Sequence, residues 1–178
     1  MGLGARAGSC RAAPLRHGVS GDRHLAELNF GTLRYDWGDP RIADFQTALS
    51  KVGAIAERCP GFIWQMDEDA MDAAQQDPSG PFGANPRTAS TLSVWADPES
   101  LWAFVERSVH GRYLRRAAEW FEPEDRGHLV LWWVEKGHRP TLAEGMNRYA
   151  LLRAQGASEQ AFDFAWLRST GQLPELVR

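Results

Sequence analysis

The sequence is poor in cysteine, in net positive charge and in long apolar runs, and each absence excludes a class of protein. Only two of the 178 residues are cysteines, Cys10 and Cys59, which form neither a disulfide framework nor a metal-ligand spacing, so a reducing cytoplasm is expected. Lys and Arg number 20 against 23 Asp and Glu, and the resulting net charge of −3 disfavours a nucleic-acid partner. No apolar stretch approaches the roughly twenty residues that cross a bilayer, so no membrane partner is expected.

Sequence motifs for nucleotide and hydrolytic chemistry are also missing. The chain contains no Gly-rich phosphate loop, no nucleophile elbow and no metal-binding histidine pair. Nicotinamide and nucleotide chemistry are therefore disfavoured, and we expect no metal site.

The composition predicts one domain between two tails. A chain of this length with 43% hydrophobic residues can bury a single sizeable core. Residues 1–23 lack apolar periodicity and predict a disordered arm, although their Arg-rich, acid-poor character is also typical of a transit peptide. We expect the domain at residues 24–167 and a C-terminal tail at 168–178.

Hydrophobic periodicity predicts the element order βαββαβα. Alternating or continuous apolar residues predict strands at 24–32, 61–68, 87–95 and 128–134. Apolar residues at helical spacing predict helices at 40–59, from 98 with a break near Gly111, and at 141–156. The run 68–86 is rich in Asp, Gln, Gly and Pro and is expected to form a surface loop or lid.

The helix starts carry capping signals. WGDP at 37–40 and WADP at 95–98 both place an Asp at the N-cap and a Pro in the first turn, where it suits a helix. Thr141 is predicted to cap the last helix in the same way. The repeated signal indicates two βα units of similar design.

The element order predicts the fold class. A βαββαβ chain typically forms the split-βαβ, ferredoxin-like α+β sheet with both main helices on one face. The adjacent Trp132 and Trp133 then place one indole on each face of the fourth strand. One indole is expected to pack under the helices and the other to lie on a bare face, where an apolar patch needs a partner. We therefore expect a homodimer.

A family resemblance is carried by residues 24 to 164. The segments LAELNF, AERCPGFIWQ, TLSVWAD, SVHGRYLRRAAEWFEP and LVLWWVEKGHRPTLAEGMNRYALLRAQG together resemble the bacterial domain-of-unknown-function family 3291. That family resembles the dimeric α+β barrel superfamily, which includes antibiotic-biosynthesis monooxygenases, haem-degrading monooxygenases and other haem enzymes. The resemblance implies a dimeric α+β barrel whose subunits each hold a ligand between sheet and helices, but a fold alone fixes no reaction.

The pocket on the helix side of the sheet is expected to be rich in aromatic residues. Its predicted lining consists of Phe62, Trp64, Met66, Leu92, Val94 and one of Trp132 and Trp133, with Trp102 and Phe104 above. Such a lining suits a flat aromatic or polyketide-like molecule. An ordinary aromatic core explains the same residues.

The polar candidates cluster in SVHGRYLRRAAEW. His110 and Tyr113 are predicted to transfer protons, and Arg116 and Trp120 to contact the substrate. If haem binds, His110 or His128 is the predicted ligand.

The same cluster has an explanation without function. A histidine at a helix C-terminus interacts favourably with the helix dipole, and the arginines can form a solvated cationic face that pairs with Glu119 or Glu122.

Three functions fit these patterns. The first is a dimeric small-molecule enzyme of bacterial secondary metabolism, either a cofactor-independent monooxygenase or a cyclase or isomerase, acting on an aromatic or polyketide-like substrate. The second is a haem-binding protein of the same fold, and the third is a non-catalytic small-molecule binding module. No cofactor is the leading expectation, with haem as the alternative.

Overall fold

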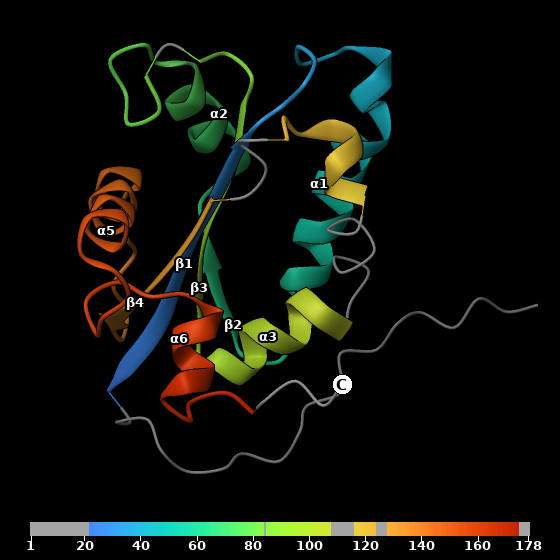
Figure 1. Ribbon diagram of the computed structural model, residues 1–178. Coiled ribbons are helices and arrows are strands. Elements are labelled where there is room, and N and C mark those ends of the chain that lie inside the picture. The colour runs from blue at the N-terminus through green and yellow to red at the C-terminus, as the bar shows by residue number, and fades with distance from the viewer. Residues whose placement is uncertain (1–21, 84, 108–115, 124–127, 175–178) are drawn as a thin grey trace, which may run out of the picture.

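A four-stranded sheet forms the centre of the computed structural model, which describes residues 22–83, 85–107, 116–123 and 128–174 (Figure 1). The strands are β1 (Arg23–Thr32), β2 (Phe62–Gln65), β3 (Thr88–Trp95) and β4 (His128–Glu135). Their order is β2-β3-β1-β4, and every neighbouring pair is antiparallel. This is the sheet of the split-βαβ arrangement, so the predicted ferredoxin-like α+β fold is confirmed.

The helices connect and cover the strands. They are a 3₁₀ turn (Pro40–Ile42), α1 (Ala43–Ala56), α2 (Glu68–Gln76), α3 (Pro98–Arg107), α5 (Leu142–Gln155) and α6 (Phe164–Ser169). Within the described ranges, none of them is both long and apolar enough to cross a membrane.

All three predicted capping side chains accept a backbone hydrogen bond, but Asp39 caps the 3₁₀ turn Pro40–Ile42 and not α1, whose N-cap Ile42 has no side-chain hydrogen bond. Asp39 accepts a hydrogen bond of 2.8 Å from the Arg41 amide, and Asp97 accepts one of 2.7 Å from the Ser100 amide. Thr141 Oγ1 likewise accepts from the amide of Glu144 at 3.2 Å. Each cap satisfies an amide that the first turn leaves without a partner, and the caps at Asp97 and Thr141 mark where α3 and α5 begin.

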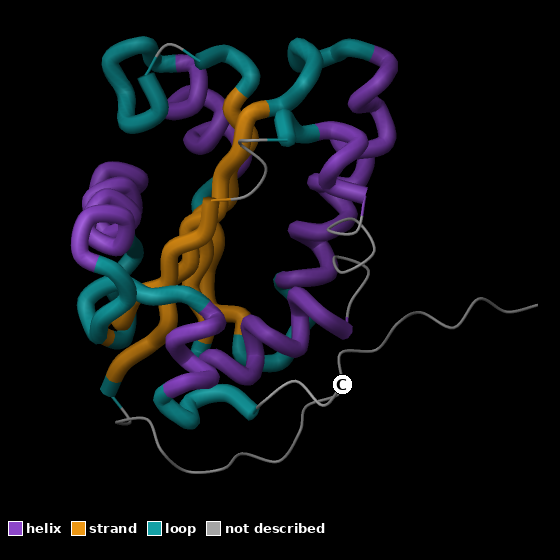
Figure 2. The backbone as a smooth tube through the Cα atoms, in the orientation of Figure 1, coloured by secondary structure: helices purple, strands orange, loops and turns teal. Residues whose placement is uncertain are grey.

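Both faces of the sheet are covered within one chain (Figure 2). The crossover helices α1 and α3 share one face together with α6, whereas α5 and α2 lie on the other (Figure 1). The expectation of a bare face is therefore wrong. Trp132 is fully buried on the α5 side, and the half-buried Trp133 packs against Phe162 on the α6 side, with ring centroids 5.6 Å apart. The argument for a homodimer loses its basis, and dimerisation stays a prediction.

Helix α5 lies close to the sheet because Gly145 has no side chain. A Cβ atom at Gly145 would lie 2.8 Å from Leu28 Cδ2 and 3.3 Å from both Leu28 Cβ and Trp132 Cη2. The Trp132 Nε1 group donates a hydrogen bond of 2.9 Å to Glu144, the neighbour of Gly145. This contact joins α5 to β1 and β4 without space for a further methyl group.

A Gly145→Ala variant should lower the free energy of unfolding by about 1–2 kcal/mol, because the cost of overpacking exceeds the gain in helix propensity. Gly53→Ala is the matched control, since it also replaces a glycine inside a helix but meets only Gln65 Nε2, at 3.9 Å. That control should raise the free energy of unfolding by up to about 1 kcal/mol. Urea denaturation measures both changes, and a stabilised Gly145→Ala variant would contradict the close contact.

A β-bulge in β2 reverses part of the predicted pattern. Phe62 pairs with Trp95 and Trp64 with the adjacent Val94, so two residues of β2 span one step of β3. Phe62 therefore lies on the α1 side and Trp64 on the α5 side, whereas simple alternation predicted one face for both. The extra residue, Ile63, is 45% exposed.

Three further expectations need correction. The run 68–86 is not only a loop, because α2 occupies its first half, where Asp67 accepts hydrogen bonds from the amides of Asp69 and Ala70. The core extends past residue 167 to Leu173, which is 3% exposed. Cys59 is disulfide-bonded, so the cysteines give no support to a reducing compartment.

Candidate functional site

Space for a small molecule lies between the sheet and helices α1 and α3. Two adjoining cavities of about 280 and 480 Å³ share part of their lining. Both are lined by Glu27, Asn29 and Thr91 of the sheet, Leu49 and Val52 of α1, and Val105 of α3. These volumes are typical of ligand pockets.

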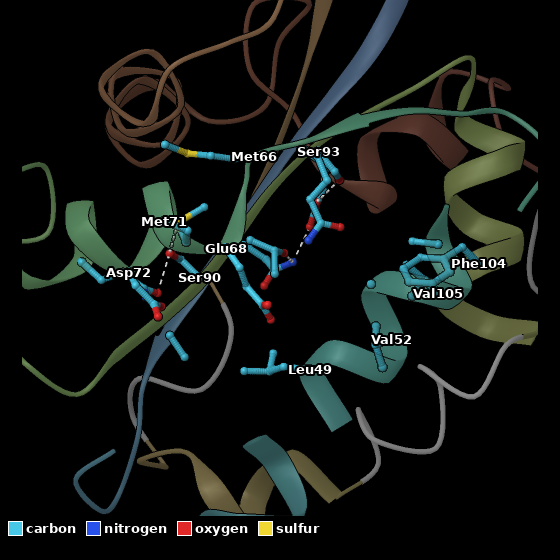
Figure 3. A pocket seen from close by; sticks show the side chains of 18 of the residues that line it. Leu49, Val52, Met66, Glu68, Met71, Asp72, Ser90, Ser93, Phe104 and Val105 are labelled. Atoms are coloured by element: carbon cyan, nitrogen blue, oxygen red, sulfur yellow. Dashed lines mark hydrogen bonds between the residues drawn. The ribbon is translucent and has the colours of Figure 1, made fainter. Parts of the chain in front are cut away.

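Polar strand residues face apolar helix residues across the cavity. Glu27 pairs with Ser93 and Asn29 with Thr91 in the register of β1 and β3, so the four side chains form one polar patch. Figure 3 shows Leu49 and Val52 of α1 on the opposite side of the space from Ser93. The predicted apolar face of α1 exists, but at these positions it contacts the cavity.

The polar patch is held together by a chain of hydrogen bonds. Asn29 Nδ2 donates to Glu27 Oε1 at 2.5 Å and to Thr91 Oγ1 at 2.7 Å. Ser93 Oγ donates to Glu27 Oε2 at 2.8 Å and accepts from Trp95 Nε1 at 3.0 Å. Each Glu27 oxygen thus accepts one of these bonds, and an ionised carboxylate has lone pairs for more. The carboxylate is fixed in position with acceptor capacity left for a ligand.

Burial changes the acidity of Glu27. Glu27 is only 6% exposed. Removal of its carboxyl group from water raises the pKa of that group to about 7, although the hydrogen bonds from Asn29 and Ser93 oppose the rise. Near neutral pH the carboxyl group therefore exists in both protonation states. A carboxyl group with this pKa can accept and return a proton at physiological pH.

The predicted aromatic lining is only partly brought together. Trp102 of α3 and Trp120 line the larger cavity, and Met66 lines the smaller one. Phe62 lies behind this lining, against the edge of Trp95 at a centroid distance of 5.4 Å. Whether these residues contact a substrate stays a prediction.

Other predicted lining residues face away from the cavity. Trp64, Leu92, Val94 and Trp132 pack in the core on the α5 side, and Trp133 is absent from the lining of both cavities. The interpretation that α1 and α3 cover these residues is wrong, because the α5 face is the more apolar one and a helix of the same chain covers it.

The predicted polar residues of the 108–120 segment are not part of the described site. His110 and Tyr113 lie outside the described residues. Arg116 is partly exposed and pairs with Glu119 at 2.8 Å and with Asp44 at 3.2 Å, while its guanidinium lies 4.7 Å from the Trp120 ring centre. The predicted pairing with Glu119 is confirmed.

His128 lies in an aromatic cluster. Its Nδ1 atom is 2.7 Å from the Tyr149 hydroxyl, and its ring lies 4.8 Å from that of Phe30, measured between centroids. No three His, Cys, Asp or Glu side chains of the described ranges come together as metal ligands.

Sequence reasoning missed the polar patch as a site. Glu27, Asn29, Thr91 and Ser93 are not among the site residues that the sequence predicts. One signal was present, because Glu27 interrupts the strand segment LAELNF between two leucine-containing pairs. A charged residue at the centre of a strand that is apolar on both faces is a functional candidate, since its burial costs free energy.

The fold and the cavity define an α+β protein with a pocket of small-molecule size. A profile of the family described as a domain of unknown function, DUF3291, matches residues 24–174, and the chain belongs to this family. No curated protein shows a significant match. The solved structure of SnoaB, a cofactor-independent oxygenase from Streptomyces nogalater, has 15% identity and a TM-score of 0.41, and the match covers 69% of this chain and 99% of that chain.

Proposed function

We propose that the protein is a small-molecule enzyme in which Glu27 is the general base for a mainly apolar substrate. The observation that carries this proposal is the position of Glu27, a buried carboxyl group with a pKa near 7 that lines both cavities. Structural carboxylates are rarely buried without a cationic partner, and the partners described for Glu27 are neutral.

Proton abstraction is the reaction step that this geometry supports. Glu27 takes a proton from an acidic C–H or O–H group of the substrate, and the electron pair left behind forms an enolate or phenolate. Return of the proton to another position of the substrate gives isomerisation. Ring closure follows instead when the enolate carbon attacks a carbonyl carbon of the same substrate: a C–C bond forms, the carbonyl π bond breaks, and the alkoxide takes the proton back from Glu27. The same anion can instead pass two electrons to dioxygen, the oxidant: a C–O bond forms, the peroxide takes the proton from Glu27, and loss of water leaves a new carbonyl group, which is a cofactor-independent oxygenation. All three outcomes begin with one proton transfer to Glu27.

The larger cavity favours an aromatic or polyketide-like body for the substrate. Phe45, Trp120, Phe121 and Phe164 line it together with apolar residues of α1 and α3. Flat rings gain from burial against such side chains, and a few polar groups then fix their orientation. We propose that such a substrate belongs to bacterial secondary metabolism.

Deuterium exchange tests the proposed role of Glu27. The probe is 2-tetralone, a neutral bicyclic ketone with weakly acidic C–H bonds, incubated with protein in D₂O and followed by NMR. The protein should speed exchange about a hundredfold or more relative to a Glu27→Gln variant. A Glu159→Gln variant, which removes an exposed carboxylate outside both linings, should exchange like the unmodified protein.

Binding is measured separately from exchange. A Val52→Trp variant places an indole in the space shared by the two cavities and should prevent quenching of tryptophan fluorescence by the probe. Binding without any Glu27-dependent exchange would overturn the catalytic proposal in favour of a binding module. Binding that survives Val52→Trp in a folded variant would overturn the assignment of the site.

A further inference from the structure

The charges around the two cavities have one sign. Carboxylates of Glu27, Glu68 and Asp72 line the smaller cavity, and Glu27 and Glu106 line the larger one. Among the described residues that line either cavity, no Lys or Arg occurs. An anionic ligand would therefore meet like charges without a compensating cation, which costs affinity and acts as selection against it.

Helix α2 supplies two of these carboxylates. Glu68 and Asp72 are four residues apart and thus share one face of the helix. In Figure 3, Glu68 lies between Asp72 and Val52, and its side chain is directed toward Leu49. Asp72 accepts a hydrogen bond of 3.2 Å from Gln75.

The short strand β2 explains why α2 reaches the cavity. The ladder between β2 and β3 ends at the pair Gln65 and Ser93, and no other strand of the described residues pairs with the remaining part of the β3 edge. Helix α2 packs against β3 there, where Ser90 Oγ donates a hydrogen bond of 2.8 Å to Gln75. The acidic face of α2 consequently borders the open edge of the sheet.

Aromatic side chains also line the smaller cavity. Trp37, Trp95 and Phe104 line the smaller cavity. Trp95 and Phe104 are stacked with centroids 5.1 Å apart. Because Trp95 and Phe104 cover each other's faces, they supply apolar surface for the body of a ligand, and the preference for positive charge comes from the carboxylates.

We infer that the ligand of this site is an apolar molecule with a protonated amine, whose ring system fills the larger cavity and whose ammonium group lies beside Glu68 and Asp72. The inference rests on the proposed function, because it names the substrate class of the same pocket. The ammonium group donates hydrogen bonds to the carboxylates of Glu68 and Asp72 at the border of the cavity. The ring system displaces water from the aromatic lining.

Three probes with one ring system separate charge from shape. They are 2-(naphthalen-1-yl)ethylamine, 2-(naphthalen-1-yl)ethanol and 1-naphthylacetic acid, titrated at pH 7 by calorimetry. The amine should bind about tenfold more tightly than the acid, which corresponds to about 1.4 kcal/mol, with the alcohol between them. A Glu68→Gln, Asp72→Asn double variant should lose this preference and bind the alcohol unchanged.

The matched control is Asp69→Asn, which removes one charge from α2 at a residue that lines neither cavity. It should keep the preference for the amine. Equal binding of amine and acid, or a preference that survives in the double variant, overturns the charge inference alone. Failure of all three probes to bind, including the neutral alcohol, overturns the proposed pocket together with the inference.

Discussion

Replacing Glu27 by glutamine should stabilise the protein at pH 8 although it removes the proposed catalytic group. The pKa of Glu27 is raised from its ordinary value of 4.5 to about 7, because the folded state buries the carboxyl group. As the pH rises from 4.5 to 7, the unfolded chain loses this proton before the folded one, so stability falls through that window. Above pH 7 the unfolding free energy is lower by about 3 kcal/mol for this reason. A glutamine at this position does not titrate, so the variant avoids this loss.

Urea denaturation at pH 4.5 and pH 8 measures this effect. The gain in stability of Glu27→Gln over the unmodified protein should be larger at pH 8 by about 3 kcal/mol. The exposed Glu159→Gln control should show no such dependence on pH. If Glu27→Gln changed the unfolding free energy by the same amount at both pH values, that result would contradict the raised pKa of Glu27, whatever the outcome of the exchange experiment.

A Trp132→Ala variant should lose about 3–5 kcal/mol of unfolding free energy, whereas Trp133→Ala should lose about 1–2 kcal/mol. Trp132 is fully buried between β4 and α5, and its removal leaves a cavity and deprives Glu144 of the hydrogen bond from the indole. Trp133 is only half-buried, under Phe162 and with the Arg23 guanidinium 5.7 Å from its ring centre.

The two tryptophan variants together test which face of the sheet is the better packed. Urea denaturation with a spectroscopic signal from circular dichroism compares them without relying on tryptophan fluorescence. A Trp132→Phe variant keeps the buried ring and should recover much of the loss. Equal losses for the two alanine variants would mean that the α5 side is no more tightly packed than the α6 side.

The strands and helix starts could be predicted from local signals, because these depend on neighbouring residues. Capping by Asp39, Asp97 and Thr141 is such a signal, and so is the alternation in β1 and β3. The element order then determined the sheet. The placement of α5 was not predictable in this way. A helix that follows β4 can pack on either face of the sheet, and its apolar positions do not indicate which face it covers.

The site was missed for a related reason. β1 carries leucine on both faces, with Leu25 on the side of Glu27 and Leu28 opposite, so alternation alone does not reveal which face holds the ligand. One extra residue at the β2 bulge also moved Trp64 to the other face, and single-residue register changes leave no mark in hydrophobic periodicity. His110 and Tyr113 stay predictions.

Because the two faces of the sheet are packed unequally, the residues that stabilise the fold and the residues that shape the pocket lie on different faces. On the α5 side, Gly145 and Trp132 leave no space, so a change there alters the stability of the whole domain. On the α1 side, residues such as Leu49 and Val52 border empty volume, so their replacement changes the shape of the pocket at small cost to the core. Substitution on the α1 side is therefore the route by which mutation, natural or directed, can adapt this domain to new ligands.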